Sequence, residues 1–147
     1  MSRFHADDVF FPNWTNWHSR ERLDPLDDTA QDFGISGVYL LARFETPEDS
    51  KRRCEPFHLH PSVIYIGVSR STIHRLGRYH GTVARYKSTF SDITLSKLYC
   101  SVWQSEISNY DIQRGNVMAQ AFLLYVERKL IWEYVSRFDR LPSLNHL

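Results

Sequence analysis

Three short runs of apolar and aromatic residues predict the strands of this chain. The run at 63–68, Val-Ile-Tyr-Ile-Gly-Val, is rich in β-branched and aromatic residues, which is typical of a buried strand. The run at 38–44 has the same character, and the run at 97–103 alternates in polarity. We expect the runs at 38–44 and 63–68 to pair as a hairpin, joined by a long polar loop over 45–62 that contains three prolines.

Two segments have helical periodicity. Between 71 and 86 one stripe recurs at helical spacing, and it consists of Ile73, Leu76, His80 and Val83. The stronger pattern runs from about Asn116 to about Phe138, and Pro142 prevents any continuation. Its apolar stripe consists of Leu123, Leu124, Leu130, Ile131 and Tyr134. A second polar loop is expected over 104–115.

Glu127 falls inside the apolar stripe of the long helix. An unpaired carboxylate in such a place costs several kcal/mol, on the order of the desolvation of one buried charge. Glu127 therefore needs a partner, which is a basic side chain, a proton or a cation. A buried arginine such as Arg75 is one candidate.

These elements predict an α/β chain of the α+β type, in which a small three-stranded antiparallel sheet is flanked by helices. The 147 residues suffice for one domain with a hydrophobic core. Residues 1–33 form an irregular acidic arm, and 34–147 form the body. We expect the arm's aromatic residues to pack on the body rather than to stack on nucleic-acid bases; they are Phe10, Phe11, Trp14 and Trp17.

Charge is distributed unevenly along the chain. Residues 1–50 contain 4 Lys and Arg against 10 Asp and Glu, a balance of −6, whereas 51–147 contain 14 against 7, a balance of +7. No acid occurs from Ser69 to Ser88, directly after the predicted strand at 63–68. A basic body of this kind indicates a polyanionic partner, although solvated charge on two unrelated faces explains the same composition.

Neither a membrane span nor a signal peptide is predicted. No apolar run reaches 18 residues, and the first residues lack an apolar core. Two cysteines, Cys54 and Cys100, without secretory context favour reduced thiols and a cytoplasmic, intracellular protein. Cys54 with His58 and His60 suggests zinc only weakly, because no fourth ligand is evident.

Five features in order resemble the GIY-YIG nuclease family. They are Gly37-Val38-Tyr39, Tyr65-Ile66-Gly67, Arg75 on the following helix, Glu127 on a later helix, and Asn145 beyond it. The resemblance covers about Gly34 to His146. It implies an endonuclease that hydrolyses phosphodiester bonds of DNA with one Mg²⁺ or Mn²⁺ ion per site, the ion being held by Glu127.

The resemblance also implies a set of catalytic residues that converge on one face: Tyr39, Tyr65, Arg75, Tyr79, Glu127 and Asn145. Arg75 supplies an always-charged fork for phosphate oxygens. The proton acceptor remains open among Tyr39, Tyr79 and His80. Residues expected to follow the nucleic-acid backbone are Arg70, Arg78, His80, Arg85 and Lys87.

Other interpretations remain open. Tyr39 and Tyr65 could be ordinary strand packing, and Asn145 could satisfy only a C-terminal turn. Many family members have a histidine where this chain has Tyr79, so a catalytically inactive module that binds nucleic acid or protein is one alternative, and a ribonuclease is another. Because one active site cuts one strand, a homodimer is possible.

Overall fold

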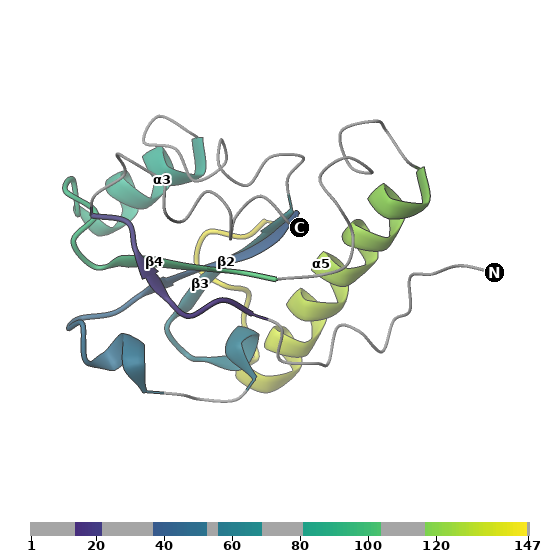
Figure 1. Ribbon diagram of the computed structural model, residues 1–147, viewed down its shortest axis with the longest axis horizontal. Helices are drawn as coiled ribbons and strands as arrows, with labels where there is room; N and C mark the ends of the chain where they lie inside the picture. The colour runs from purple at the N-terminus through teal and green to yellow at the C-terminus, as the bar shows by residue number, and fades with distance from the viewer. Residues whose placement is uncertain (1–13, 22–36, 53–55, 69–80, 104–116, 147) are drawn as a thin grey trace.

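The computed structural model describes residues 14–21, 37–52, 56–68, 81–103 and 117–146. Within them the chain has an α+β architecture, in which a four-stranded antiparallel sheet carries one long helix on each face (Figure 1). The strands are β1 (His18–Ser19), β2 (Val38–Arg43), β3 (Val63–Val68) and β4 (Leu98–Val102). The helices are α3 (Gly81–Phe90) and α5 (Val117–Phe138), with the short 3-10 helices η2 (Asp49–Lys51) and η3 (Phe57–Leu59).

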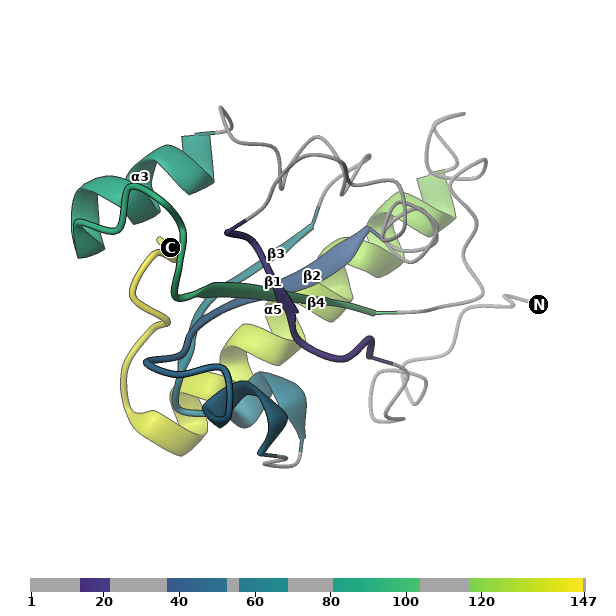
Figure 2. The ribbon, with the colours of Figure 1, turned by 60° about the vertical axis from the view of Figure 1, so that its left-hand side comes forward.

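The sheet has the order β1-β4-β2-β3, so β2 is central and β3 lies at one edge (Figure 2). β2 pairs with β3 as predicted, and Tyr39 lies opposite Gly67. On its other side β2 pairs with β4, which places Tyr39 opposite Val102. The predicted strands at 38–44, 63–68 and 97–103 are therefore found within one residue of their expected ends.

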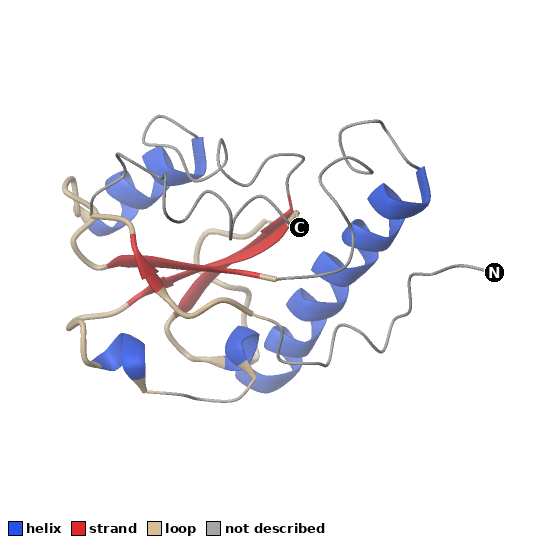
Figure 3. Ribbon diagram, viewed as in Figure 1, coloured by secondary structure: helices blue, strands red, loops and turns tan. Residues whose placement is uncertain are grey.

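The prediction of three strands was wrong by one. The fourth strand is β1, which comes from the arm and pairs with β4 through His18 opposite Cys100 and Ser19 opposite Tyr99 (Figure 3). A strand of two polar residues has no apolar periodicity to reveal it. It exists because β4 offers unpaired backbone groups at the edge of the sheet.

Packing holds this part of the arm in place. Trp17 packs edge-on against Phe44, with ring centroids 5.4 Å apart, and stacks on Phe57 at 5.5 Å. Thr15 is buried and joins the arm to β4, because its Oγ1 accepts a hydrogen bond from the backbone N–H of Val102 at 2.9 Å. Residues 1–13 and 22–33 of the predicted arm lie outside the described residues.

Successive residues of β2 face opposite sides of the sheet and so divide the core in two. Val38, Leu40 and Ala42 pack with α5, whereas Tyr39 and Leu41 pack on the side of α3. The buried face of α5 consists of Ala119, Leu123, Val126, Leu130, Ile131 and Tyr134.

One member of the predicted stripe of α5 is on the wrong side. Leu124 is 52% exposed, because it lies about 200° around the helix from the fully buried Val126. On the other helix, the described part of the predicted 71–86 segment starts at Gly81 and continues to Phe90, four residues past the expected end. Residues 71–80 lie outside the described residues.

Within the described part of the chain, no helix is both long and apolar enough to cross a membrane. Cys100 is a free, buried thiol on β4, and burial raises its pKa to about 12. Cys54 lies outside the described residues.

Replacing Thr15 by Val tests how the arm is held. Valine keeps the shape of threonine but removes the acceptor for the buried N–H of Val102. An unsatisfied buried donor costs about 1–3 kcal/mol, so we expect Thr15→Val to lower the free energy of unfolding by that amount in urea denaturation. Thr15→Ser retains the hydroxyl and should lose less than half as much. Equal losses in both variants would contradict the role given to this hydrogen bond.

Candidate functional site

Two tyrosines from neighbouring strands lie together on the α3 side of the sheet. The ring centroids of Tyr39 on β2 and Tyr65 on β3 are 5.8 Å apart, and the ring planes are inclined at 41°. The strand register explains this proximity. Tyr39 pairs with Gly67, and Tyr65 stands two residues before Gly67 on the same face of β3.

Gly67 provides the space for both rings. A Cβ at this position would lie 2.4 Å from Cε2 of Tyr65 and 3.0 Å from both Cζ and Oη of Tyr39. The tyrosines therefore close over the backbone at a place where any side chain would force them apart. The sequence pattern Tyr65-Ile66-Gly67 thus has a physical reason in this fold.

Asn145 binds the strand that carries Tyr65 and Gly67. Its Oδ1 accepts a hydrogen bond from the N–H of Ile66, and its Nδ2 donates to the C=O of Ile66, both at 2.9 Å. The N–H of Leu144 donates to the C=O of Ile64 at 2.8 Å. The C-terminal segment therefore covers the outer edge of β3. Asn145 does more than satisfy its own turn, because that turn is closed by its backbone N–H, which donates to the C=O of Pro142.

Arg85 reaches the tyrosine pair from α3. Its Cζ lies 5.9 Å from the ring centroid of Tyr65, and its Nη1 lies 2.5 Å from Nε2 of His146. Lys87 lies on the same helix. His146 was not among the predicted site residues. The signal that could have found it is its position next to Asn145, on the segment that binds β3.

Glu127 lies on α5, among the buried residues Leu123, Leu130 and Ile131. Its side chain is only 15% exposed, and its Oε1 is 3.7 Å from Nε of Arg128. α5 packs on the sheet face opposite the one that carries Tyr39. The place of Glu127 in the site stays a prediction.

The remaining predicted site residues lie outside the described residues. They are Arg70, Arg75, Arg78, Tyr79 and His80. The guanidinium fork and two of the three candidate proton acceptors therefore stay predictions. The third candidate, Tyr39, is fully buried, whereas Tyr65 is half-buried.

The described residues contain no group of three His, Cys, Asp or Glu side chains that could hold a metal ion. Mg²⁺ keeps several waters and often takes only one or two carboxylates in proteins. A Mg²⁺ ion held by Glu127 alone stays a prediction.

A zinc site receives no support from the histidines at 58 and 60. Nε2 of the buried His58 lies 2.7 Å from Oε1 of Glu133, and Nδ1 of His60 accepts a hydrogen bond from the N–H of Ser62. Burial lowers the pKa of His58, against the opposing effect of Glu133. The His58–Glu133 pair thus joins the 45–62 loop to α5 as part of the packing.

Comparisons with models of known protein families, with curated proteins and with solved structures found no significant match. The resemblance to GIY-YIG nucleases therefore depends on the motif residues themselves. The structure describes the local geometry around Tyr39, Tyr65, Gly67 and Asn145, and membership of the family stays a prediction.

Replacing Gly67 by Ala tests the packing of the tyrosine pair. The added methyl group must displace the rings of Tyr39 and Tyr65, so we expect a loss of about 1–3 kcal/mol in the free energy of unfolding. Gly81→Ala is the matched control, because nothing lies within 4 Å of its added methyl group. The control should be neutral or slightly stabilising in a helix. If the two alanine variants denature at the same urea concentration, that result would contradict the close packing of the tyrosine rings over Gly67.

Proposed function

We propose that this protein is a metal-dependent endonuclease of the GIY-YIG type that hydrolyses phosphodiester bonds of DNA. One observation carries the proposal. The two motif tyrosines, which are 26 positions apart in sequence, meet over the motif glycine. The motif asparagine binds the backbone of Ile66, between Tyr65 and Gly67. A chance match of short motifs gives no reason for the two tyrosines to meet over the glycine, or for the asparagine to bind the residue between Tyr65 and Gly67.

The side chains of this cluster suit phosphodiester hydrolysis. The hydroxyls of Tyr39 and Tyr65 would orient the attacking water and the phosphate. Arg85, held against the ring of Tyr65, offers charged N–H donors to phosphate oxygens, as Arg75 would by resemblance. Asn145 acts as a positioning residue, since both ends of its amide bind β3. A proton-accepting role for Tyr39 requires its pKa to fall from the usual value of about 10.

Glu127 is the residue that would hold the divalent cation. When bound, the cation supplies positive charge to the phosphate and to the leaving oxygen. The 15% exposure of the carboxylate leaves it poorly solvated, which strengthens its attraction for a positive charge. That positive charge is either the cation or the guanidinium of an arginine. Cleavage depends on added metal in the first case and does not in the second.

A binding module without catalysis is the second candidate. The observation that favours it is the complete burial of Tyr39, because a catalytic hydroxyl must reach the substrate or its water. In this case the basic body would hold nucleic acid without cutting it. A ribonuclease differs from the first proposal only in its substrate.

Nicking of supercoiled plasmid in the presence of Mg²⁺ separates these functions. We expect cleavage by the wild-type chain, abolition by EDTA, and a rate at least about 100-fold lower for Glu127→Ala. Glu48→Ala removes an exposed carboxylate from the 45–62 loop and should cut at the wild-type rate. Parallel reactions with single-stranded DNA, branched DNA and RNA define the substrate.

Failure to cut any of these substrates with Mg²⁺ or Mn²⁺ would rule out the endonuclease and leave the binding module. Cleavage of RNA but of no DNA substrate would show that the protein is a ribonuclease instead of a DNA endonuclease.

The proposal includes a homodimer, because each chain has one candidate site and duplex DNA has two strands. The outward face of α5 suits a second copy of the chain. It carries large exposed apolar side chains in two rows of seven-residue spacing, Val117 with Leu124, and Met118 with Tyr125 and Trp132. Two such helices can pair antiparallel with the centre of the pairing between Leu124 and Tyr125. In this register Trp132 of one copy faces Val117 of the other, and Arg128 meets no like charge.

Light scattering after size-exclusion chromatography tests the dimer. We expect a mass near twice the 17.4 kDa of one chain, and a monomer for the double variant Leu124→Glu/Trp132→Glu. The control is Ile93→Glu, which changes a side chain that is 79% exposed outside α5 and should remain dimeric. A monomeric wild-type chain at high micromolar concentration would refute the dimer without touching the catalytic proposal.

A further inference from the structure

Two basic side chains meet beside the tyrosine pair, and among the described residues no acid pairs with either of them. Nη1 of Arg85 on α3 lies 2.5 Å from Nε2 of His146 in the C-terminal segment. A guanidinium only donates hydrogen bonds, so Nε2 is the acceptor in this contact. Other basic groups are paired differently: Arg43 and Lys97 both bind Glu45, and Arg128 lies near Glu127.

Most N–H donors of Arg85 are not used by its described contacts. Among the described residues no carboxylate lies within 4.0 Å of its guanidinium, whose contacts are the ring of Tyr65 at 5.9 Å and His146. An arginine has five N–H donors, and these two contacts use few of them. A guanidinium in this state, on a residue that is partly exposed, is suited to an anion that reaches it from solvent.

The backbone holds His146 in position. Its neighbour Asn145 binds both the N–H and the C=O of Ile66, and Leu144 before it is buried and binds Ile64. His146 itself is exposed, so its ring is reachable. The segment thus presents an accessible imidazole from a fixed backbone, which limits the entropy lost when a ligand binds.

We propose that Arg85 and His146 form a phosphate site that holds a phosphodiester of the nucleic-acid strand next to Tyr65. An oxyanion at their meeting point accepts from an N–H of Arg85 and from an N–H of the His146 ring. The titratable group that the described contacts place beside this pair is Tyr65 of β3, whose ring lies against Arg85. The identity of the ligand rests on the proposed function, whereas the site rests on the side chains alone.

The test is binding of a short oligothymidylate to the full chain in EDTA, which prevents cleavage. Fluorescence anisotropy gives the dissociation constant over a range of salt, and NMR follows the imidazole signals, with His146 assigned from His146→Gln. We expect the His146 signal to move saturably with the oligonucleotide. We expect Arg85→Gln to weaken binding about tenfold and to reduce the salt dependence by about one released counterion. We expect His146→Gln to weaken binding as well.

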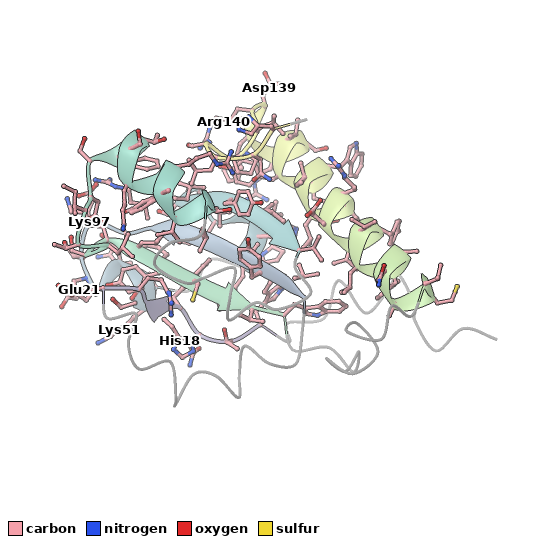
Figure 4. All side chains as sticks on the ribbon, turned by 90° about the horizontal axis from the view of Figure 1, so that it is seen from above. His18, Glu21, Lys51, Lys97, Asp139 and Arg140 are labelled. Atoms are coloured by element: carbon pink, nitrogen blue, oxygen red, sulfur yellow. The ribbon has the colours of Figure 1, made fainter. Side chains whose placement is uncertain are left out.

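The matched control is Lys51→Gln, which removes the same charge. The C-terminal segment that carries His146 leaves α5 near Arg140, and Figure 4 shows Lys51 well apart from Arg140. Equal weakening by Arg85→Gln and Lys51→Gln, or an unmoved His146 signal, would overturn the site. Inorganic phosphate is the second ligand tested. If phosphate moves the His146 signal and the oligonucleotide does not, the assignment to nucleic acid is overturned.

The two proposals fail separately. A chain that does not nick plasmid but shows the His146 shift retains the phosphate site and loses the nuclease. A chain that nicks plasmid, with Arg85→Gln as active as wild type and no His146 shift, retains the nuclease and loses the site.

Discussion

The antiparallel register of β2 on β3 is the constraint on which the candidate site depends. It sets Tyr39 opposite Gly67 and leaves Tyr65 two residues away on the same face. The two rings then meet only because Gly67 has no side chain to separate them. A shift of one residue would turn Tyr65 to the face of α5 and end the contact, so strand pairing and site geometry are one requirement.

Segments from the two parts of the chain farthest apart in sequence lie at the two edges of the sheet. β1 of the arm pairs with β4 and is itself one edge, and the segment around Asn145 binds β3 at the other. A two-residue edge strand and a covered edge both limit pairing with other chains. At the β3 edge the cover has a second consequence, because it fixes the strand of Tyr65 and brings His146 to Arg85. Stability and the proposed function thus depend on the same few hydrogen bonds.

Much of the fold was accessible from the sequence because strong apolar periodicity marks buried elements. The strand at 63–68 and the helix at about 116–138 were found nearly as predicted. β1 was missed because two polar residues become a strand only through their partner. Leu124 was misplaced because a stripe drawn through adjacent leucines ignores the 100° between successive helical residues, and Val126 shows where the buried face is centred.

The site was predictable only as a set of residues, not as an arrangement. The contact of Tyr39 with Tyr65 and the need for glycine at 67 follow from strand register, which the long connection over 45–62 does not specify. The binding of Asn145 to Ile66 and the contact of Arg85 with His146 join residues more than 60 positions apart, and no local pattern announces them. Glu127 could be identified as an unusual carboxylate in an apolar row, but its partner could not be identified.

The central claim is that Glu127 and the two tyrosines belong to one metal-dependent site. Mn²⁺ is paramagnetic and broadens the NMR signals of nearby protons, so it measures this proximity without any reaction. The account predicts that Mn²⁺ broadens the ring signals of Tyr39 and Tyr65 in the wild-type chain, and that Glu127→Ala abolishes the effect. Tyrosine signals that stay sharp, or that broaden equally in Glu127→Ala, would contradict it.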